Sequence, residues 1–325
     1  MMNIEKKIVA IGGGTGLSIL LRGLKRVASN ITAIVTVADD GGGSGILRED
    51  LGMLPPGDIR SNIVALANTE PIMNELLQYR FTDGILKGQN FGNLMIAALV
   101  GISGNFEEAI KKINDIFAVT GKVLPVTLDE IHLIAELENG DLVIGESKIP
   151  REAKKRNSPI SKVYLDKTSA SGLTDAITEI ENADIIILGP GSLYTSIIPN
   201  ILIEDIDNAI NKSKAKKIFV INMMTQPGET DNFSVRDHVD VFFKHSRYRY
   251  IDLVFSNNGF IHEDIISRYR EEDSYPILAT NEDREYLESI DILLLEADVV
   301  EVKKGYLRHD SEKMADIIAQ YLELN

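Results

Sequence analysis

The chain has 325 residues, and its 49 acidic residues outnumber its 34 basic residues, which gives a formal net charge of −15. With 44% hydrophobic and 26% charged residues, the composition is that of a globular chain that buries a large core, and it excludes a disordered protein. The acidic balance argues against nucleic-acid binding, because such proteins usually carry a basic surface. The absence of cysteine excludes disulfides, thiolate nucleophiles and Cys-ligated zinc.

The amino-terminal segment Met1–Lys7 leads directly into a strand-like run. It lacks the apolar stretch and the cleavage site of a secretory signal peptide. The longest apolar stretches, such as Leu94 to Ile102, fall well short of the ~18–20 residues that span a bilayer. We therefore expect a cytoplasmic protein without membrane insertion.

Short β-branched runs alternate with helix-like segments along the chain, a pattern that predicts parallel strands joined by crossover helices. The runs are continuously hydrophobic, as in strands that are covered on both faces. This predicts an α/β fold in a single domain, 1–325, with a three-layer, Rossmann-like, mostly parallel sheet. The expected strands are Lys7–Ile11, Ile31–Val37, Asp184–Leu188, Lys217–Ile221 and Ile251–Phe255.

Two further segments have a distinct pattern. Between about 122 and 165 the sequence consists of strand-like pieces, and Asn139-Gly140 suits a tight hairpin turn, so we expect a small β insertion there. The run Leu94–Val100 is apolar on all sides, which predicts a helix buried between other elements.

The first expected strand ends in a glycine-rich turn that opens a helix: Gly12, Gly13, Gly14, Thr15 and Gly16. Glycines let backbone N–H groups approach an anion, and the helix dipole favours negative charge there. The turn does not match the dinucleotide fingerprint G-x-G-x-x-G, because Leu17 stands at the last glycine position. The glycines and the helix start still predict that this turn contacts a phosphate or a sugar. The alternative is a plain β–α turn without a ligand.

A similar turn follows the strand at 184–188, where Gly189 and Gly191 precede three hydroxyl residues, Ser192, Thr195 and Ser196. Amides and hydroxyls together can bind phosphate oxygens without a charged side chain. The alternative is that these hydroxyls only cap the helix.

Charged residues follow the second expected strand. Asp39 and Asp40 precede a glycine loop. Paired carboxylates at this place are suited to bind Mg²⁺ or ribose hydroxyls. The alternative is an ordinary Asp-Gly turn that binds no ligand. Farther along, Asp58 can cap a helix whose first turn contains Arg60. A cation there opposes the helix dipole, which indicates an anionic ligand or an acidic neighbour.

The strand at 217–221 runs into a polar segment that contains Asn222, Thr225 and Asp231. Because polar groups at the carboxyl end of a parallel strand face the ligand crevice, this segment is expected beside the two glycine turns. An ordinary surface loop is the alternative.

Seven motifs occur in an order that resembles the gluconeogenesis factor family, also called YvcK-like: GGGTG, ADDGG, PPGDIR, GESKIP, GPGSLYTSIIPN, MTQPGETD and LRHD. The family belongs to the superfamily of the magnesium-dependent enzyme 2-phospho-L-lactate transferase. The resemblance implies a CofD-like fold, a cytoplasmic UDP-sugar ligand such as UDP-N-acetylglucosamine, and a role in cell morphogenesis during gluconeogenic growth. It assigns the ligand cleft to the residues named above and to Asn93, with Mg²⁺ at Asp39 and Asp40.

Three positions depart from the pattern of that family. Gly43 replaces a serine, Ser61 replaces the asparagine after GDIR, and Gln89-Asn90 replaces a His-Ser pair. Loss of the histidine weakens the case for acid–base catalysis. The resemblance therefore favours a nucleotide-sugar-binding regulator; a magnesium-dependent phosphoryl or nucleotidyl transferase is the alternative, and a nicotinamide dehydrogenase ranks third. A regulatory protein partner and a homo-oligomer are both compatible with the sequence.

Overall fold

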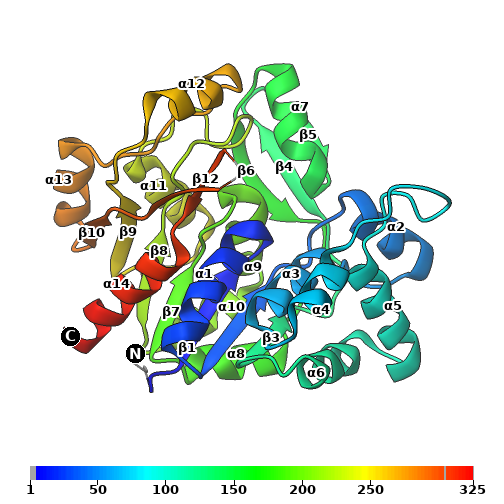
Figure 1. Cartoon of the computed structure of the whole chain (residues 1–325). Coiled ribbons are helices and arrows are strands. Elements are labelled where there is room, and N and C mark those ends of the chain that lie inside the picture. The colour runs from blue at the N-terminus through cyan, green and yellow to red at the C-terminus, as the bar shows by residue number, and fades with distance from the viewer. Residues whose placement is uncertain (1–4, 304, 325) are drawn as a thin grey trace.

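A computed structural model of the protein describes residues 5–303 and 305–324. Its centre is a seven-stranded parallel sheet in the order β10-β9-β8-β7-β1-β2-β3 (Figure 1). The strands are β1 Ile8–Gly12, β2 Ile31–Val35, β3 Lys122–Pro125, β7 Ile185–Leu188, β8 Lys216–Val220, β9 Leu253–Asn257 and β10 Leu293–Ala297. The α/β, Rossmann-like fold expected from the sequence is confirmed.

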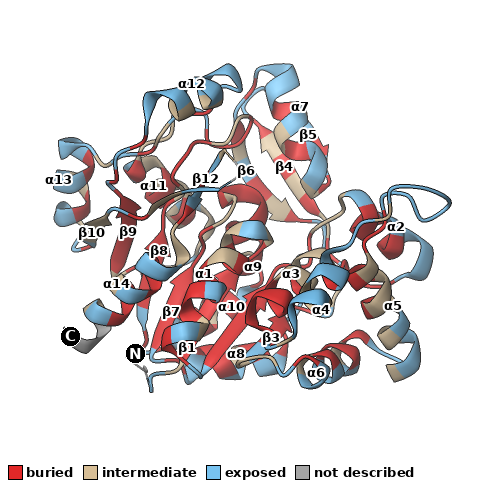
Figure 2. Ribbon diagram, viewed as in Figure 1, coloured by how far each residue is buried: buried red, intermediate tan, exposed pale blue. Residues whose placement is uncertain are grey.

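The inner strands are buried because helices cover both faces of the sheet (Figure 2). Every residue of β1, β2, β7 and β9 is buried, as their unbroken hydrophobic sequences require. Helices α1, α3 and α14 lie on one face, and α8, α10 and α11 on the other (Figure 1). The strands thus form the middle of three layers, and their carboxyl ends meet at one edge of the sheet.

The longer helices that cover the sheet have amphipathic sequences, and the packing of α1 on α14 is especially close. A Cβ atom at Gly23 would lie 1.8 Å from the carbonyl oxygen of Ser311, so only glycine allows this approach. The helices are α1 Gly14–Val27, α2 Gly42–Leu51, α3 Gly57–Leu66, α4 Pro71–Gln78, α5 Phe91–Ser103, α6 Phe106–Ile116, α7 Ile149–Arg156, α8 Thr174–Glu181, α9 Ile198–Ile201, α10 Glu204–Lys212, α11 Val235–His245, α12 Glu263–Glu271, α13 Asn281–Ser289 and α14 Ser311–Leu324. In residues 5–303 and 305–324, none combines the length and apolar character needed to cross a bilayer.

The β insertion is a separate three-stranded antiparallel sheet in the order β5-β4-β6, with strands β4 Leu133–Leu137, β5 Leu142–Ile144 and β6 Ile160–Leu165. Gly140 has a φ of +87° in the turn between β4 and β5. The insertion begins later than the expected 122, because β3 pairs in parallel with β2 in the central sheet. A local strand pattern shows that a strand forms, and the tertiary structure decides which sheet it joins. A last hairpin pairs β11 Val300–Lys303 with β12 Tyr306–His309.

Helix α5 differs from the expectation of a fully buried helix. Only Gly92, Asn93 and Ile96 are buried among its residues, and Ile102 is 74% exposed. The helix lies at the outer side of the helical segment α2–α6, which connects β2 to β3 (Figure 1). An all-apolar sequence could not distinguish a central helix from one that is covered on one side only.

Candidate functional site

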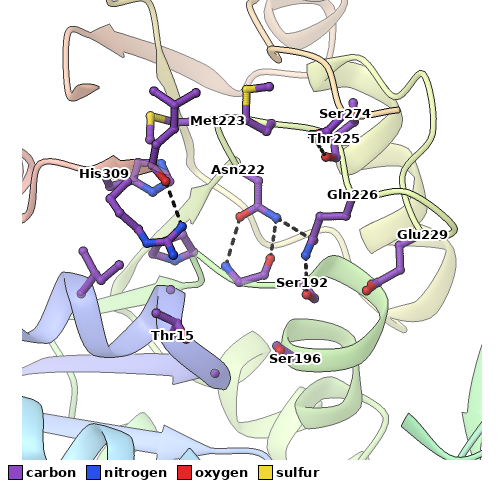
Figure 3. Close-up of a pocket in the computed structure, with 18 of the residues that line it drawn as sticks. Thr15, Ser192, Ser196, Asn222, Met223, Thr225, Gln226, Glu229, Ser274 and His309 are labelled. Atoms are coloured by element: carbon purple, nitrogen blue, oxygen red, sulfur yellow. Dashed lines mark hydrogen bonds between the residues drawn. The ribbon is translucent and has the colours of Figure 1, made fainter. Parts of the chain in front are cut away.

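A cavity of about 570 Å³ opens at the carboxyl ends of β1, β7 and β8 (Figure 3). Open parallel sheets generally bind their ligands in this position. Both glycine turns and the segment after β8 line it. The residues expected from the sequence that line this cavity are Gly13, Gly14, Thr15, Gly16, Gly191, Ser192, Ser196, Asn222 and Thr225.

The first glycine turn is held against its neighbours too closely for any side chain. A Cβ atom at Gly13 would lie 2.6 Å from an oxygen of Asp58, and one at Gly16 would lie 2.5 Å from the carbonyl oxygen of Pro190. The N–H of Gly14 donates to the carboxyl of the half-buried Asp58. The amides of Thr15 and Gly16, in the first turn of α1, have no carbonyl acceptor within the helix, so they remain suited to an anion.

The second turn is fixed by the segment after β8. The Asn222 side chain donates to the Gly191 carbonyl at 2.8 Å and accepts from the Gly191 N–H at 3.2 Å. It also donates to Gln226, which in turn donates to the Ser192 hydroxyl oxygen at 2.7 Å (Figure 3). The Gly191 amide is therefore occupied, whereas the hydroxyl proton of Ser192 remains free to donate to a ligand oxygen.

Two glutamates converge on Thr195, the buried Glu229 and the half-buried Glu146. Glu229 accepts from the Tyr194 N–H and from the Thr195 side chain, and burial raises its pKa to about 7. Its Oε2 atom is buried without a partner. Glu146 also bonds to Thr195, and burial together with the nearby charges of Asp39, Asp58 and Glu229 raises its pKa to about 8. Thr195 itself is only 3% exposed, so its hydroxyl supports this wall of the site rather than facing a ligand.

A second cavity of about 320 Å³ adjoins the first and shares Gly14 and Thr15 with it. Asp39, Asp58, Arg60 and Asn93, all expected at a single cleft, line this second cavity. Burial and the neighbouring charge of Asp39 raise the pKa of Asp58 to about 6. Burial also raises the pKa of Asp39, although hydrogen bonds from the Gly41 N–H and the Ser44 hydroxyl oppose that rise. The structure thus divides the predicted site into two neighbouring cavities.

The carboxylates of Asp39 and Asp40 bind different parts of the chain. Asp39 accepts from the N–H of Gly41 at 2.8 Å, and Asp40 accepts from the N–H of Ser147 at 2.9 Å. In the part of the chain that the structure describes, no group of three or more acidic or histidine side chains is arranged to hold a metal ion. Because Mg²⁺ often combines one or two carboxylates with ligand phosphates and water, this pair fits Mg²⁺ only as part of a ligand complex.

Five of the expected residues line neither cavity: Gly12, Asp40, Gly189, Thr195 and Asp231. Gly12 and Gly189 end or follow central strands, and the Gly189 N–H donates to the carbonyl of Ile11. Asp231 accepts from the N–H of Gly228 and so closes the loop after β8. These residues build the frame of the two cavities.

Sequence reasoning did not assign several residues of the larger cavity. Gln226, Glu229, Tyr269, Arg308 and His309 line it, and α12 and β12 contribute three of them. Gln226 and Glu229 belong to the polar segment after the strand at 217–221, which was expected at the crevice, and Arg308 and His309 had only the motif LRHD as a signal. Arg80, on the second cavity, had no signal at all, since it stands in a polar loop far along the chain from the glycine turns.

Two of the three departures from the family pattern lie against each other. A Cβ atom at Gly43 would lie 3.0 Å from the side-chain oxygen of Gln89, so the missing side chain at 43 leaves room for the longer one at 89. The third, Ser61, lines the second cavity and receives a hydrogen bond from Arg60 at 3.2 Å. All three changes therefore gather around the second cavity.

Comparison with known proteins agrees with this geometry. Residues 8–300 match the family model described as 2-phospho-L-lactate transferase CofD. The chain is 42% identical to the gluconeogenesis factor of Bacillus subtilis over 323 residues, which covers 99% of this chain and 100% of that protein. It is 55% identical to a Thermoanaerobacterium thermosulfurigenes protein over 98% of this chain and 97% of that one.

A solved structure supports the same assignment. The crystal structure of a Bacillus halodurans protein superimposes with a TM-score of 0.92 at 39% identity, covering 97% of this chain and 99% of that chain. Matches of this length cover both cavities and every strand of the central sheet. The chain therefore belongs to the CofD family, among its gluconeogenesis factor (YvcK-like) members.

Proposed function

We propose that this protein binds a nucleotide diphosphate sugar, of the UDP-N-acetylglucosamine type, and acts as a regulator. The observation that supports this most directly is the pair of glycine turns that meet in the 570 Å³ cavity. The amides of Thr15 and Gly16 and the hydroxyls of Ser192 and Ser196 offer donors to a diphosphate. The rest of the cavity has room for a nucleoside.

The chemistry of the cavity suits recognition more directly than catalysis. The acid nearest the second turn, Glu229, already accepts two hydrogen bonds from the chain and is fully buried. His309, which also lines the cavity, is buried and has its pKa lowered to about 4 by that burial. His309 is therefore a weak base at neutral pH, and Glu229, although its pKa of about 7 would suit proton transfer, is held in place by its two hydrogen bonds to Tyr194 and Thr195.

The biological part of the proposal follows the relatives named gluconeogenesis factor. We place the protein in the cytoplasm, where it would report the supply of nucleotide sugar and support cell shape during growth on gluconeogenic carbon sources. A regulator of this kind passes its signal on, so the proposal includes a protein partner, and self-association is compatible with it. Neither nucleic acid nor a membrane is required.

Calorimetric titration tests the binding. The protein should bind UDP-N-acetylglucosamine and UDP in preference to GDP and NAD. Ser192→Ala removes one donor to a charged phosphate, which is worth about 1.5–3 kcal/mol, so affinity should fall roughly tenfold or more. Ser289→Ala on α13, whose hydroxyl bonds only to the carbonyl of Tyr286, is the matched control. Equal affinity in the wild type and Ser192→Ala would contradict this placement of the diphosphate.

A second candidate is a magnesium-dependent phosphoryl or nucleotidyl transferase. The adjoining cavity favours it, because a transferase needs room for an acceptor beside its donor, and Asp39 and Asp58 line that space. Incubation with UDP- and GDP-linked donors, Mg²⁺ and a panel of hydroxyl acceptors, followed by mass spectrometry, should then reveal a transfer product. Failure to detect one across the panel would count against this candidate.

A further inference from the structure

Two arginines on the second cavity form no ion pair with a carboxylate among the described residues. Arg60 lies in the first turn of α3, and Arg80 follows α4. Arg60 donates to the Ser61 hydroxyl, Arg80 donates to the Gly88 carbonyl, and the Nε atom of Arg60 is buried without a partner. Neither guanidinium is in any of the ion pairs between described residues, although the chain has 15 more acidic than basic residues.

The two guanidinium groups are close enough to affect each other. The charge of Arg80, after burial, is a further cause of the lowered pKa of Arg60, and the charges of Asp58 and Asp39 only partly oppose that lowering. Arg60 also lies at the positive end of its helix, where a cation is unfavourable. The two positive charges repel each other, and neither forms an ion pair. A bound anion would reduce this repulsion.

The acids that share this cavity act on Arg60 through their charges, but they form no ion pair with either arginine. Asp39 is bonded to the Gly41 N–H and Asp58 to the Gly14 N–H, and neither carboxylate lies within ion-pair distance of Arg60 or Arg80. Hydrogen bonds to their own loops hold these acids in place. The guanidinium donors are therefore left for a group from outside the chain.

A buried amide adds an independent requirement. Asn93 is 4% exposed and lines the cavity, and its Oδ1 atom is buried without a partner while its Nδ2 faces the Ser44 hydroxyl at 3.5 Å. An unpartnered buried acceptor is costly unless a donor reaches it. The second cavity therefore calls for a ligand with an anionic group and also a hydroxyl or amide hydrogen.

The two cavities meet at Gly14 and Thr15. A nucleotide sugar whose diphosphate lies at the start of α1 would pass this point and place its sugar in the second cavity. A volume of about 320 Å³ is at the lower end of ligand pockets, which suits a single sugar ring better than a second nucleotide.

We propose that the sugar of the bound nucleotide carries a carboxylate, as in a uronic acid or a lactyl ether, which Arg60 and Arg80 bind while Asn93 accepts a sugar hydroxyl or amide hydrogen. Guanidinium groups bind carboxylates through paired, charge-assisted hydrogen bonds, which a neutral sugar cannot form. This inference rests on the proposed nucleotide-sugar function and states which sugars that site prefers.

Calorimetric titration with matched ligands tests it. UDP-glucuronate and UDP-glucose differ only in a carboxylate at C6, and UDP-N-acetylmuramate differs from UDP-N-acetylglucosamine by its lactyl group. At least one acidic member should bind tenfold or more tightly than its neutral counterpart. Arg80→Gln, a change at an exposed side chain, should reduce that preference to less than threefold and leave UDP affinity unchanged, whereas Arg236→Gln on α11 should change neither value.

Every other outcome contradicts the inference, and the outcomes can be distinguished from one another. Equal affinity for the acidic and neutral members of both pairs overturns the inference and leaves the proposed function standing. A preference that persists in both Arg80→Gln and Arg60→Gln assigns the carboxylate to another place and also overturns it. Tight binding of free glucuronate, unaffected by UDP, would show a separate anion site. If neither UDP nor any UDP-sugar binds, the proposed function fails together with this inference.

Discussion

Asn222 holds Gly191 from both sides, since its side chain donates to the Gly191 carbonyl at 2.8 Å and accepts from the Gly191 N–H at 3.2 Å. These hydrogen bonds join two residues that lie 31 positions apart in the sequence, at the point where β7 and β8 both end. The second glycine turn is consequently fixed before any ligand arrives. Preformed turns of this kind lower the ordering cost of binding.

Loss of this clamp should weaken both the fold and the site. Asn222→Ala leaves the amide and carbonyl of Gly191 without partners in a half-buried place, so the free energy of unfolding should fall by about 1–3 kcal/mol. Urea unfolding measures this loss, and titration with UDP-N-acetylglucosamine should show weaker binding to the folded variant. An unchanged urea midpoint would contradict this expectation, because it would mean that water satisfies the Gly191 amide and carbonyl as well as the Asn222 side chain does.

Glycine 16 offers a test of the contact between the two turns. Gly16→Ala places a Cβ atom 2.5 Å from the Pro190 carbonyl oxygen, so the turns must separate, at an expected cost of about 1–3 kcal/mol. Gly101→Ala in α5 is the matched control, because its Cβ meets nothing within 4 Å. That control should stabilise the helix by about 0.5–1 kcal/mol. Thermal unfolding of both variants should give shifts of opposite sign, and a stabilised Gly16→Ala would contradict the packing of the turns.

Two acids with raised pKa values predict how stability depends on pH. Glu229 and Glu146 have folded-state pKa values of about 7 and about 8, against an ordinary value of 4.5. Between pH 4.5 and 8 the folded protein therefore holds protons that the unfolded chain releases. Stability should be highest at the acidic end of this window and should fall as the pH rises, by up to about 1.4 kcal/mol per pH unit for each protonated group.

Substitution of one acid by its neutral counterpart isolates that effect. Glu229→Gln should reduce the dependence of the unfolding free energy on pH between 4.5 and 7, because one of the two titrating groups is gone while Glu146 remains. Glu285→Gln, on the exposed side of α13, should leave the slope as it is in the wild type. Urea unfolding at several pH values gives the slopes directly. The account is wrong if Glu229→Gln retains the full wild-type slope.

Magnesium should act only together with a phosphorylated ligand. Because Asp39 and Asp40 bond to different loop amides and no third acid completes a metal group among the described residues, Mg²⁺ alone should not raise the melting temperature. With UDP present, Mg²⁺ should add a further rise that Asp39→Asn removes. A rise with Mg²⁺ alone would instead indicate a site that is complete without ligand.

The sequence by itself determined the class of fold and the edge of the sheet at which the larger cavity opens. Unbroken runs such as Ile8–Ile11 and Ile185–Leu188 can be buried only in a sheet covered on both faces, and a glycine turn after such a strand marks its carboxyl end. These are local properties of pattern and backbone freedom. The predicted strands and turns were confirmed because the conformational preferences of a short segment persist in the folded protein.

Only the tertiary structure decided which side chains from distant segments lie close together. Glu146 lies about a hundred residues from Asp39 along the chain, yet their charges interact across one site, and Arg80 reaches Arg60 from beyond another helix. In the same way β3 joined the central sheet, and α5 kept one side exposed despite its apolar sequence. Burial, partner and charge environment depend on contacts between distant segments, and no local pattern encodes them.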